Sequence, residues 1–398
     1  MSNTQTTNLT ENNNNLSAEM KTFYDMTLID EATPNLVYDQ FGQKRPIPSG
    51  SGKTIEFRKF SSLPKATKPI TEGVTPDGNK LSVSSVEATV EQYGDYIEQS
   101  DMLELTAIDN TIVEATKMLG SQAGRTLDTI VRNEVVGGTN VLYAAADGIR
   151  AEHRYELTEA HKITTDDIFD AAAELKANNA PKIDGSYVAI VHPHVARDLM
   201  IASKEQGSFI DINKYANPEN IFEGEIGKIG GVRFVETTEA KIFAGADLSS
   251  ESRNLSLSAA ATNSSEITVK ETVSEDLIGR KVLIGGVQFE ITGVSGSKIT
   301  LDNAVTASSG AVVYPGEGGM NGAAVYATMV LGANAYGVTE IEGGGLQHIV
   351  KQLGAGADPL NQRSSIGWKA TKVAARLVEE NMVRIESCSY KSKTAKEN

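Results

Sequence analysis

A Gly-Lys-Thr triplet at residues 52–54 is the feature of this sequence that comes nearest to a catalytic motif. A phosphate-binding loop also needs a glycine five positions before the glycine of that triplet, so that the backbone can close around the phosphates. That position holds Ile47, and the residues that follow alternate apolar Ile55 and Phe57 with charged side chains, which is typical of a β-strand. We therefore predict a turn that leads into a β-hairpin, and a nucleotide hydrolase that uses Lys53 is the remote alternative.

The other candidate motifs also lack parts that their chemistry requires. His192 and His194 could place two imidazoles on one face of a strand, but no acidic residue or third histidine stands at matching spacing, so we expect a strand-to-helix corner. The glycine-rich stretch 224–237 precedes a strand, whereas a dinucleotide fingerprint opens a helix. Glu379 and Glu380 are adjacent and point in different directions. We predict no enzyme activity, no catalytic residue, no cofactor and no metal site.

Composition narrows the classes of partner. The chain has 398 residues and 40% hydrophobic residues, enough for two or three domains with cores. Its 37 basic and 52 acidic residues give a net charge of −15, which argues against nucleic acid binding by the whole surface. The single cysteine, Cys388, excludes intramolecular disulfides and fits a reducing cytosol. The polar start of the chain and the short apolar window at 323–337 predict neither export nor membrane insertion.

A long hairpin follows a polar N-terminal arm. Residues 1–20 are rich in Asn and Thr and cannot bury enough surface to fold alone. Strand-period patterns at 54–60 and 83–90, within a hairpin spanning 47–97, are separated by a tip of more than twenty residues, rich in Pro and Gly. A phase change after Val83 suggests a bulge. We expect the hairpin to reach away from its own core.

The hairpin carries a local basic surplus. Between residues 53 and 68 there are five basic residues against Glu56 alone, a local charge of +4. This pattern has two interpretations, a solvated face or an arm that is steered to an acidic surface of another copy of the chain. For the second interpretation we predict inter-subunit contacts by Arg58, Lys59, Lys65, Lys68 and Glu72.

Downstream patterns indicate an α+β protein with a separate β-rich segment. Apolar residues at helical spacing predict a helix over 109–136, about 42 Å long. Its glycines, Gly120 and Gly124, suggest close packing against a sheet. Thr164 and Asp167 have the spacing of a capping box and predict the start of a helix, after which helices and strands alternate to 245. Strand-period runs at 266–270, 281–284, 289–292 and 298–301, with frequent turns over 247–317, predict an inserted small β-sandwich or barrel.

The order of these features resembles the major capsid proteins of tailed bacteriophages with the Hong Kong 97 fold. Five segments are similar to the coliphage N-four-like branch of that family: "ITEGVTPDGNKLSV", "ATVEQYGDYIEQSD", "AIVHPHVARDL", "GEIGKIGGVRFVET" and "DPLNQRSSIGWKATKVAARLVEENMVRIE". The similarity extends over residues 20–387 and leaves out the block 247–317. Five motifs in the right order are far more specific than any single glycine-rich loop.

This resemblance implies a structural role and a division of the chain. The expected parts are an N-terminal arm (1–46), an extended loop (47–100), a peripheral domain with a spine helix (101–163), an axial domain (164–246 and 318–357), and a return to the peripheral domain with a C-terminal tail (358–398). The all-β, Ig-like insertion (247–317) departs from the family pattern and is expected from its strand-period runs alone. The protein would form hexamers and pentamers of an icosahedral head that encloses double-stranded DNA. It would assemble in the bacterial cytoplasm with scaffolding, portal and decoration proteins. A nanocompartment shell of the encapsulin type is the alternative.

Overall fold

The chain forms two compact units in its computed structural model. The described residues are 28, 31–32, 36–60, 63, 65, 67, 69, 72, 80–81, 83–102, 111–206, 210–211, 225–250, 252–351, 360 and 362–398. Unit 1 comprises Met1–Val135 and Asn334–Val378, and unit 2 comprises Val136–Ala333 and Glu379–Asn398. The N-terminal arm over 1–20 and most of the hairpin tip lie outside the described residues.

Unit 1 is built on a five-stranded sheet around one long strand. Its strands are β1 (Gln43–Lys44), β20 (Tyr336–Thr339), β22 (Arg363–Arg376) and β21 (Gln347–Lys351) in that order, with β4 (Glu91–Ser100) paired along β22. The β4–β22 pairing is antiparallel and runs from Lys372↔Glu91 to Arg363↔Ser100 without a shift. The short 3-10 helix η2 (Tyr38–Gln40) precedes this sheet. The sheet joins segments that lie more than 250 residues apart in sequence.

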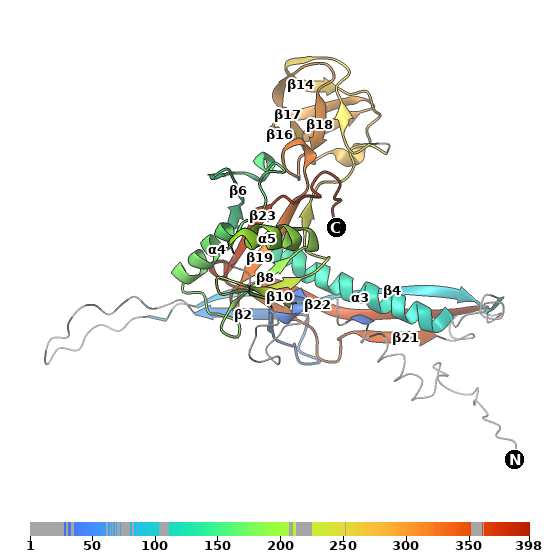
Figure 1. Cartoon of the computed structure of the whole chain (residues 1–398). Coiled ribbons are helices and arrows are strands. Elements are labelled where there is room, and N and C mark those ends of the chain that lie inside the picture. Colours follow the sequence, from blue (N-terminus) through green and yellow to red (C-terminus); the bar gives the residue numbers. More distant parts are fainter. Residues whose placement is uncertain are drawn as a thin grey trace. The chain divides into compact units, whose positions relative to one another are not determined.

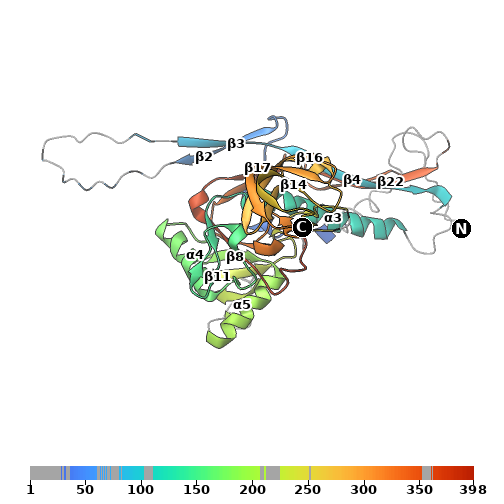
Figure 2. The same cartoon turned by 90° about the horizontal axis from the view of Figure 1, so that it is seen from above.

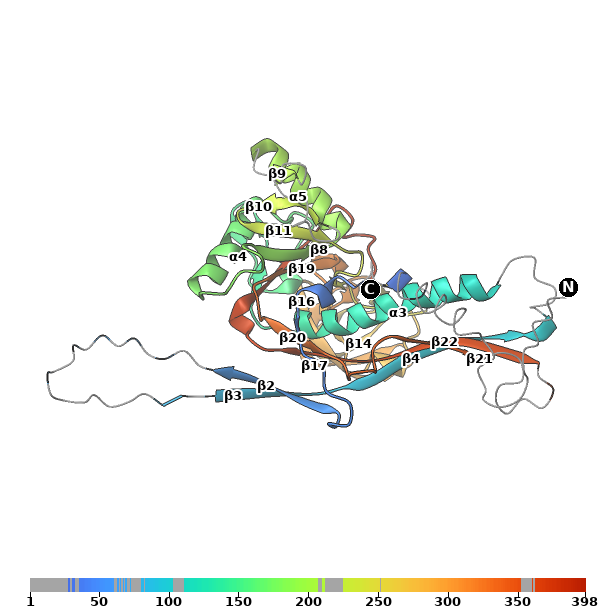
Figure 3. The ribbon, with the colours of Figure 1, turned by 90° about the horizontal axis from the view of Figure 1, so that it is seen from below.

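The long helix α3 (Thr111–Val136) packs on this sheet (Figure 3). Its apolar face, including Leu119 and Ala123, is buried with Ile366 and Trp368 of β22. The predicted end at 136 is confirmed, and the predicted start at 109 lies outside the described residues. The prediction that Gly120 allows close packing against a sheet is wrong, because a Cβ on Gly120 would lie 2.8 Å from the carbonyl oxygen of Leu28. Gly120 therefore makes room for the N-terminal segment rather than for a sheet.

Strands β2 (Thr54–Phe60) and β3 (Val83–Thr89) form the predicted hairpin and extend away from α3 (Figure 2). Their register is regular from Thr54↔Thr89 to Phe60↔Val83, so the bulge predicted after Val83 is wrong. The alternation of side chains changes there because Val83 is exposed, not because the backbone shifts. The hairpin also ends earlier than expected, since the next strand, β4, pairs with β22.

Unit 2 contains an eight-stranded mixed sheet with two helices on one face. The order is β5 (Val141–Tyr143), β23 (Met382–Ser387), β19 (Val325–Leu331), β8 (Tyr187–Val191), β11 (Val232–Glu236), β10 (Glu225–Ile229) and β9 (Ile210–Asp211), with β12 (Ile242–Phe243) paired to β19. Helices α4 (Thr165–Ala177) and α5 (Pro193–Gln206) share one apolar core with this sheet. The hairpin β6 (Ala145–Ala146) and β7 (Ile149–Arg150) and the 3-10 helices η3 (Arg154–Glu156), η7 (Met320–Gly322) and η8 (Glu379–Asn381) connect these elements.

Local sequence signals explain why these helices begin where they do. Thr164 caps α4 by accepting a hydrogen bond from the backbone N–H of Asp167, whose carboxylate accepts one from the backbone N–H of Thr164. This is the capping box that the sequence predicted, and it satisfies two N–H groups that the helix itself cannot. Pro193 opens α5 directly after β8, a position where its missing N–H costs no helical hydrogen bond.

The β-rich segment forms a sheet with a core of its own (Figure 1). Its strands are β13 (Leu255–Ser256), β18 (Val312–Pro315), β15 (Lys281–Ile284), β16 (Val287–Ser295), β17 (Lys298–Ala307) and β14 (Ala261–Thr268) in sheet order, with the 3-10 helix η6 (Glu275–Leu277) beside them. An antiparallel bridge between Leu257 and Val269 joins the two ends of this order, so the sheet closes into a small barrel. The strands predicted in this segment are confirmed.

Candidate functional site

The root of the hairpin is anchored in unit 1. Phe57 is 4% exposed, and a Cβ on Gly337 would lie only 2.6 Å from its ring, so this glycine leaves the space that the ring fills. Ala88 and Ala375 complete the buried cluster, with half-buried neighbours on β2, β3 and β22. The root of the hairpin therefore has a fixed position on the sheet of its own unit.

The outer part of the hairpin has no such cover in unit 1. Leu63, Leu81 and Val83 are 57%, 64% and 49% exposed. Among the described residues, β2 and β3 pair only with each other, so the outer edge of each strand offers unpaired backbone groups. Apolar side chains and free strand edges in one segment are typical of a surface that pairs with another chain.

The structure brings together two of the five predicted contact residues. Arg58 and Lys59, on β2, line a hollow of about 260 Å³. Arg58 also pairs with Glu56 at 3.2 Å, and this hydrogen-bonded pair lowers the pKa of Glu56. Arg45 lines the same hollow and was missed from the sequence, because its proximity depends on the pairing of β1 with β20. The remaining lining residues are Gln43, Phe57, Val86, Asn334, Leu377 and Val378.

The other three predicted contact residues lie beyond this hollow. Lys65 and Glu72 are exposed positions of the hairpin tip. Lys68 lies outside the described residues. No interaction within the described part of the chain tests their predicted role.

A buried ion pair holds the segment that leads into the hairpin. Asp39 lies between Lys372, a buried partner, and Lys44 at 2.8 Å. Burial opposes ionisation of Asp39, but the two ammonium groups outweigh it and hold the pKa of the carboxyl below its ordinary value. The backbone N–H of Tyr38 also donates to Asp128 of α3 at 2.7 Å. The path of the chain into β2 is thus set by buried polar contacts.

The motifs with catalytic potential have structural roles. Thr54 begins β2 and Gly52 has a φ of +93°, so the triplet is a turn that leads into a strand, as predicted, whereas a phosphate-binding loop opens a helix. His192 lies at the predicted corner between β8 and α5, and burial lowers its pKa to about 4. The His194 ring lies 2.9 Å from the Tyr326 hydroxyl. No cluster among the described residues has the three or more ligands that would hold a metal ion.

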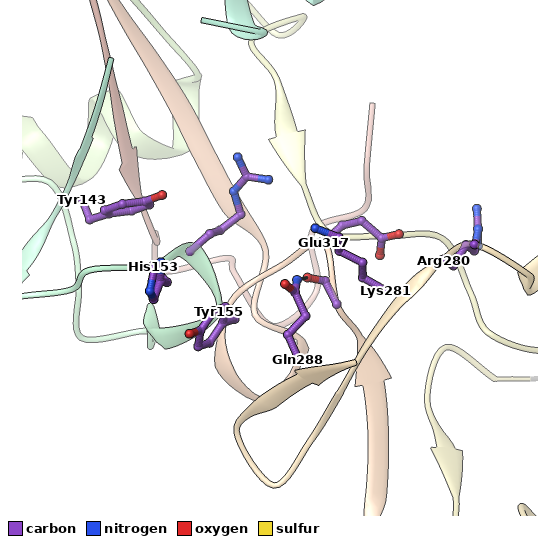
Figure 4. A pocket seen from close by; sticks show the side chains of 10 residues that line it. Tyr143, His153, Tyr155, Arg280, Lys281, Gln288 and Glu317 are labelled. Atoms are coloured by element: carbon purple, nitrogen blue, oxygen red, sulfur yellow. Dashed lines mark hydrogen bonds between the residues drawn. The ribbon is translucent and has the colours of Figure 1, made fainter. Parts of the chain in front are cut away.

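Unit 2 has an open cleft between the barrel and the eight-stranded sheet (Figure 4). Its volume is about 500 Å³, and residues of β5, η3, β15 and β16 line it. Arg154 on its wall is held by the buried carboxylate of Glu386 at 2.6 and 2.5 Å, and Arg384 donates to the same carboxylate at 2.8 Å. The cleft was missed from the sequence because its walls come from segments more than 120 residues apart.

Comparisons with known proteins agree with this architecture. Residues 83–250 match a family described as phage capsid protein. The fold is similar to the capsid of Ralstonia phage GP4, with a TM-score of 0.56 and 11% identity over 88% of this chain and 87% of that chain. It is also similar to the capsid of cyanophage P-SCSP1u, with a TM-score of 0.52 and 13% identity over 89% of this chain and 88% of that chain. These findings support a phage major capsid protein.

A third capsid fold is comparable. The head structure of Helicobacter pylori bacteriophage KHP40 gives a TM-score of 0.50 and 11% identity over 87% of each chain. No curated protein matches the sequence. The chain therefore shares the Hong Kong 97 type of capsid fold with these structures at very low sequence identity. Among its described residues no helix is long and apolar enough to cross a membrane.

Proposed function

We propose that this chain forms the hexamers and pentamers of an icosahedral phage head that encloses double-stranded DNA, and that it is of the coliphage N-four-like branch. Assembly takes place in the cytoplasm of a bacterial host, together with scaffolding, portal and decoration proteins. The observation that carries the proposal is the outer hairpin, whose apolar side chains and strand edges are unburied in its own unit.

Burial on a neighbouring subunit would stabilise this arm. Fully burying a Leu or Val side chain contributes roughly 1.5–3 kcal/mol, so Leu63, Leu81 and Val83 together provide several kcal/mol per arm. Part of that free energy offsets the ordering of the tip. Many copies with one such contact each give a shell whose strength comes from repeated moderate interfaces.

Charge favours the same arrangement. The hairpin region has a local charge of +4 in a chain of −15, so acidic surfaces of neighbouring copies attract it. Arg58 and Lys59 of this region and Arg45, which precedes it, surround one hollow, where a carboxylate of the neighbour would be paired. We assign the five predicted residues, Lys68 included, to this inter-subunit contact.

We further infer that the barrel is a domain inserted into the axial domain at 247–317 and lies on the outer face of the shell. The points where the chain leaves and returns are close together, because a Cβ on Gly245 would lie 2.5 Å from the side chains of Pro315 and Glu317. A domain with adjacent ends and its own core can be added or removed with little effect on its host. In this assignment α3 and its sheet form the peripheral domain.

A shortened hairpin tests the proposed function. Replacing residues 60–83 by an Asn-Gly turn joins Lys59 to Ser84, which face each other in the β2–β3 register. We expect this variant to fold but not to form shells when imaged by electron microscopy. Shells of normal yield from the shortened chain would contradict the proposal.

The matched control removes the barrel instead. A variant with a short Gly-Ser linker in place of 247–317 should still form shells. Images also separate the alternative function: heads with DNA and a portal vertex are expected, whereas small closed shells loaded with protein would indicate a nanocompartment.

A further inference from the structure

The cleft of unit 2 has the size and polarity of a ligand site. Its volume of about 500 Å³ is within the range of roughly 300–1,000 Å³ that is typical of binding pockets. Tyr143, His153 and Tyr155 lie on one side, and Lys281 and Glu317 lie on the other (Figure 4). The first group belongs to the eight-stranded sheet and to η3. Lys281 belongs to the barrel, and Glu317 belongs to residues 316–319, the return segment by which the chain leaves the barrel.

The two walls are fixed with respect to each other within this unit. The guanidinium of Arg253, next to β13, donates to the backbone carbonyls of Ala244, Gly322 and Ala395 at 2.8, 3.0 and 3.1 Å. One side chain thereby ties together both connections of the barrel and the C-terminal segment. A cleft between rigidly joined walls is preorganised, which lowers the free energy cost of binding.

Glycines bring the return segment equally close to its neighbours. A Cβ on Gly316 would lie 2.5 Å from the backbone of Lys281, and one on Gly319 would lie 2.3 Å from the carbonyl oxygen of Leu157. Such close approach leaves no room for a side chain. The barrel is therefore packed against the sheet domain and is not suspended on flexible linkers.

The cleft has a cationic excess. The charge of Arg154 is compensated by Glu386, which is fully buried. Arg280 and Lys281 line the cleft near Glu317, whose carboxylate they attract, and the Lys281 side chain points into the cleft (Figure 4). Glu317 is the one acid on the lining, and burial raises its pKa although Arg280 and Lys281 oppose this shift. With Arg154 paired to Glu386, the lining has two cations against one acid, and an anionic group would neutralise this local excess in a chain of −15.

The opposite wall offers a pair of stacked rings. The rings of His153 and Tyr155 stack with centroids 5.1 Å apart and planes 20° apart. A proline or an aromatic side chain can pack on such a surface, while its neighbouring residues reach the cations.

We propose that this cleft binds an acidic peptide segment of a separate protein, with its carboxylates on Lys281 and Arg280 and a flat side chain against His153 and Tyr155. This site is independent of the hairpin contact that carries the proposed function. A short peptide is favoured over nucleic acid because the chain as a whole carries a net charge of −15, which repels a long polyanion. The partner would thus be a protein with an exposed acidic and aromatic tail or loop.

Isothermal titration of the full-length, unassembled chain tests this proposal. The probe is a short peptide of alternating Glu and Tyr residues, and a peptide with Gln in place of Glu is its control. We expect binding of the acidic peptide that weakens with salt, and a loss of at least about tenfold in affinity for Lys281→Ala and for Arg280→Ala. Lys298→Ala is the matched control, since Lys298 is a barrel lysine paired with Glu266 at 2.5 Å and does not line the cleft.

Several results would overturn the proposal. Equal binding of the Gln peptide, or unchanged affinity in Lys281→Ala, would show that the cations do not recognise the ligand. Tighter binding of a DNA oligonucleotide at the same cleft would assign the site to nucleic acid. Binding that disappears in assembled shells would show that neighbouring copies cover the cleft, and would exclude a separate partner. A circular dichroism melt of each variant shows whether the fold is retained.

Discussion

The barrel and the hairpin are both antiparallel β-structure, and they differ in whether the outer edges of their strands are paired within the chain. In the barrel, a bridge between Leu257 and Val269 joins β13 and β14, the strands at the two ends of the sheet order, and the barrel encloses a core of its own. The hairpin has two strands, a buried root around Phe57 and an exposed outer part. A closed sheet satisfies its own backbone groups and apolar residues, whereas an open one needs a partner to do so. The difference separates what the chain can stabilise alone from what it can stabilise only in an assembly.

The largest effect is expected from a core substitution in the barrel. Ile291 is fully buried there, and Ile291→Ala should lower the free energy of unfolding of the unassembled chain by about 3–4 kcal/mol. Leu81→Ala on the hairpin is the matched control, since this side chain is 64% exposed and its removal should leave unfolding unchanged while reducing shell yield. Urea denaturation and electron microscopy measure the two quantities. Equal losses of stability for both variants would contradict the comparison.

The hairpin root provides the next test. Lys372→Met leaves the buried Asp39 carboxylate with only the exposed Lys44 as partner, so the free energy of unfolding should fall by roughly 3 kcal/mol at neutral pH. Because the native pKa of Asp39 is lowered, its contribution to stability is present above about pH 4 and is lost as the pH falls through the native pKa. Urea denaturation at neutral and acidic pH should show this difference between variant and parent shrinking in acid. Lys44→Ala is the control, with a smaller loss.

The local sequence pattern was sufficient to predict most helices and strands, but it did not predict which strands pair with each other. The alternation at Ile55 and Phe57 identified β2, and the capping residues Thr164 and Asp167 identified the start of α4. The partner of β4 could not be inferred, because nothing near Glu91 indicates pairing with Lys372. Strand pairing across hundreds of residues depends on tertiary packing, which a local pattern does not contain.

The candidate sites show the same limit. Arg58 and Lys59 were predicted from a run of charge, whereas Arg45 joins them only through the β1–β20 pairing. The predicted bulge failed because an exposed Val83 mimics a change of phase. The cleft combines Tyr155 with Lys281, and no spacing in the sequence connects them. Charge and periodicity therefore identified the arm, and only the folded chain identified the hollow and the cleft.

A pH-dependent effect is expected in unit 2. Burial lowers the pKa of His192 to about 4, against an ordinary value near 6.5. Between these values the unfolded chain takes up a proton that the native chain does not, so stability is present above about pH 6.5 and falls by roughly 2–3 kcal/mol as the pH approaches 4. His192→Asn should have a flatter profile in urea denaturation across this window. An unchanged slope in the variant would show that His192 is not the group responsible.

Arg58→Ala is expected to have the smallest effect on stability. It is also the sharpest test of the role of the hairpin in assembly. Arg58 and its partner Glu56 are both largely exposed, so the unfolding midpoint of the unassembled chain should not shift measurably. If the hollow with Arg45 and Lys59 pairs with an acidic neighbour, the same substitution should raise the protein concentration needed for assembly and reduce its dependence on salt, as light scattering would show. Arg363→Ala controls for loss of charge alone, because Arg363 is an exposed arginine of the same unit that lies outside the hollow. Equal assembly defects for the two variants would mean that net charge, and not the geometry of the hollow, directs the arm.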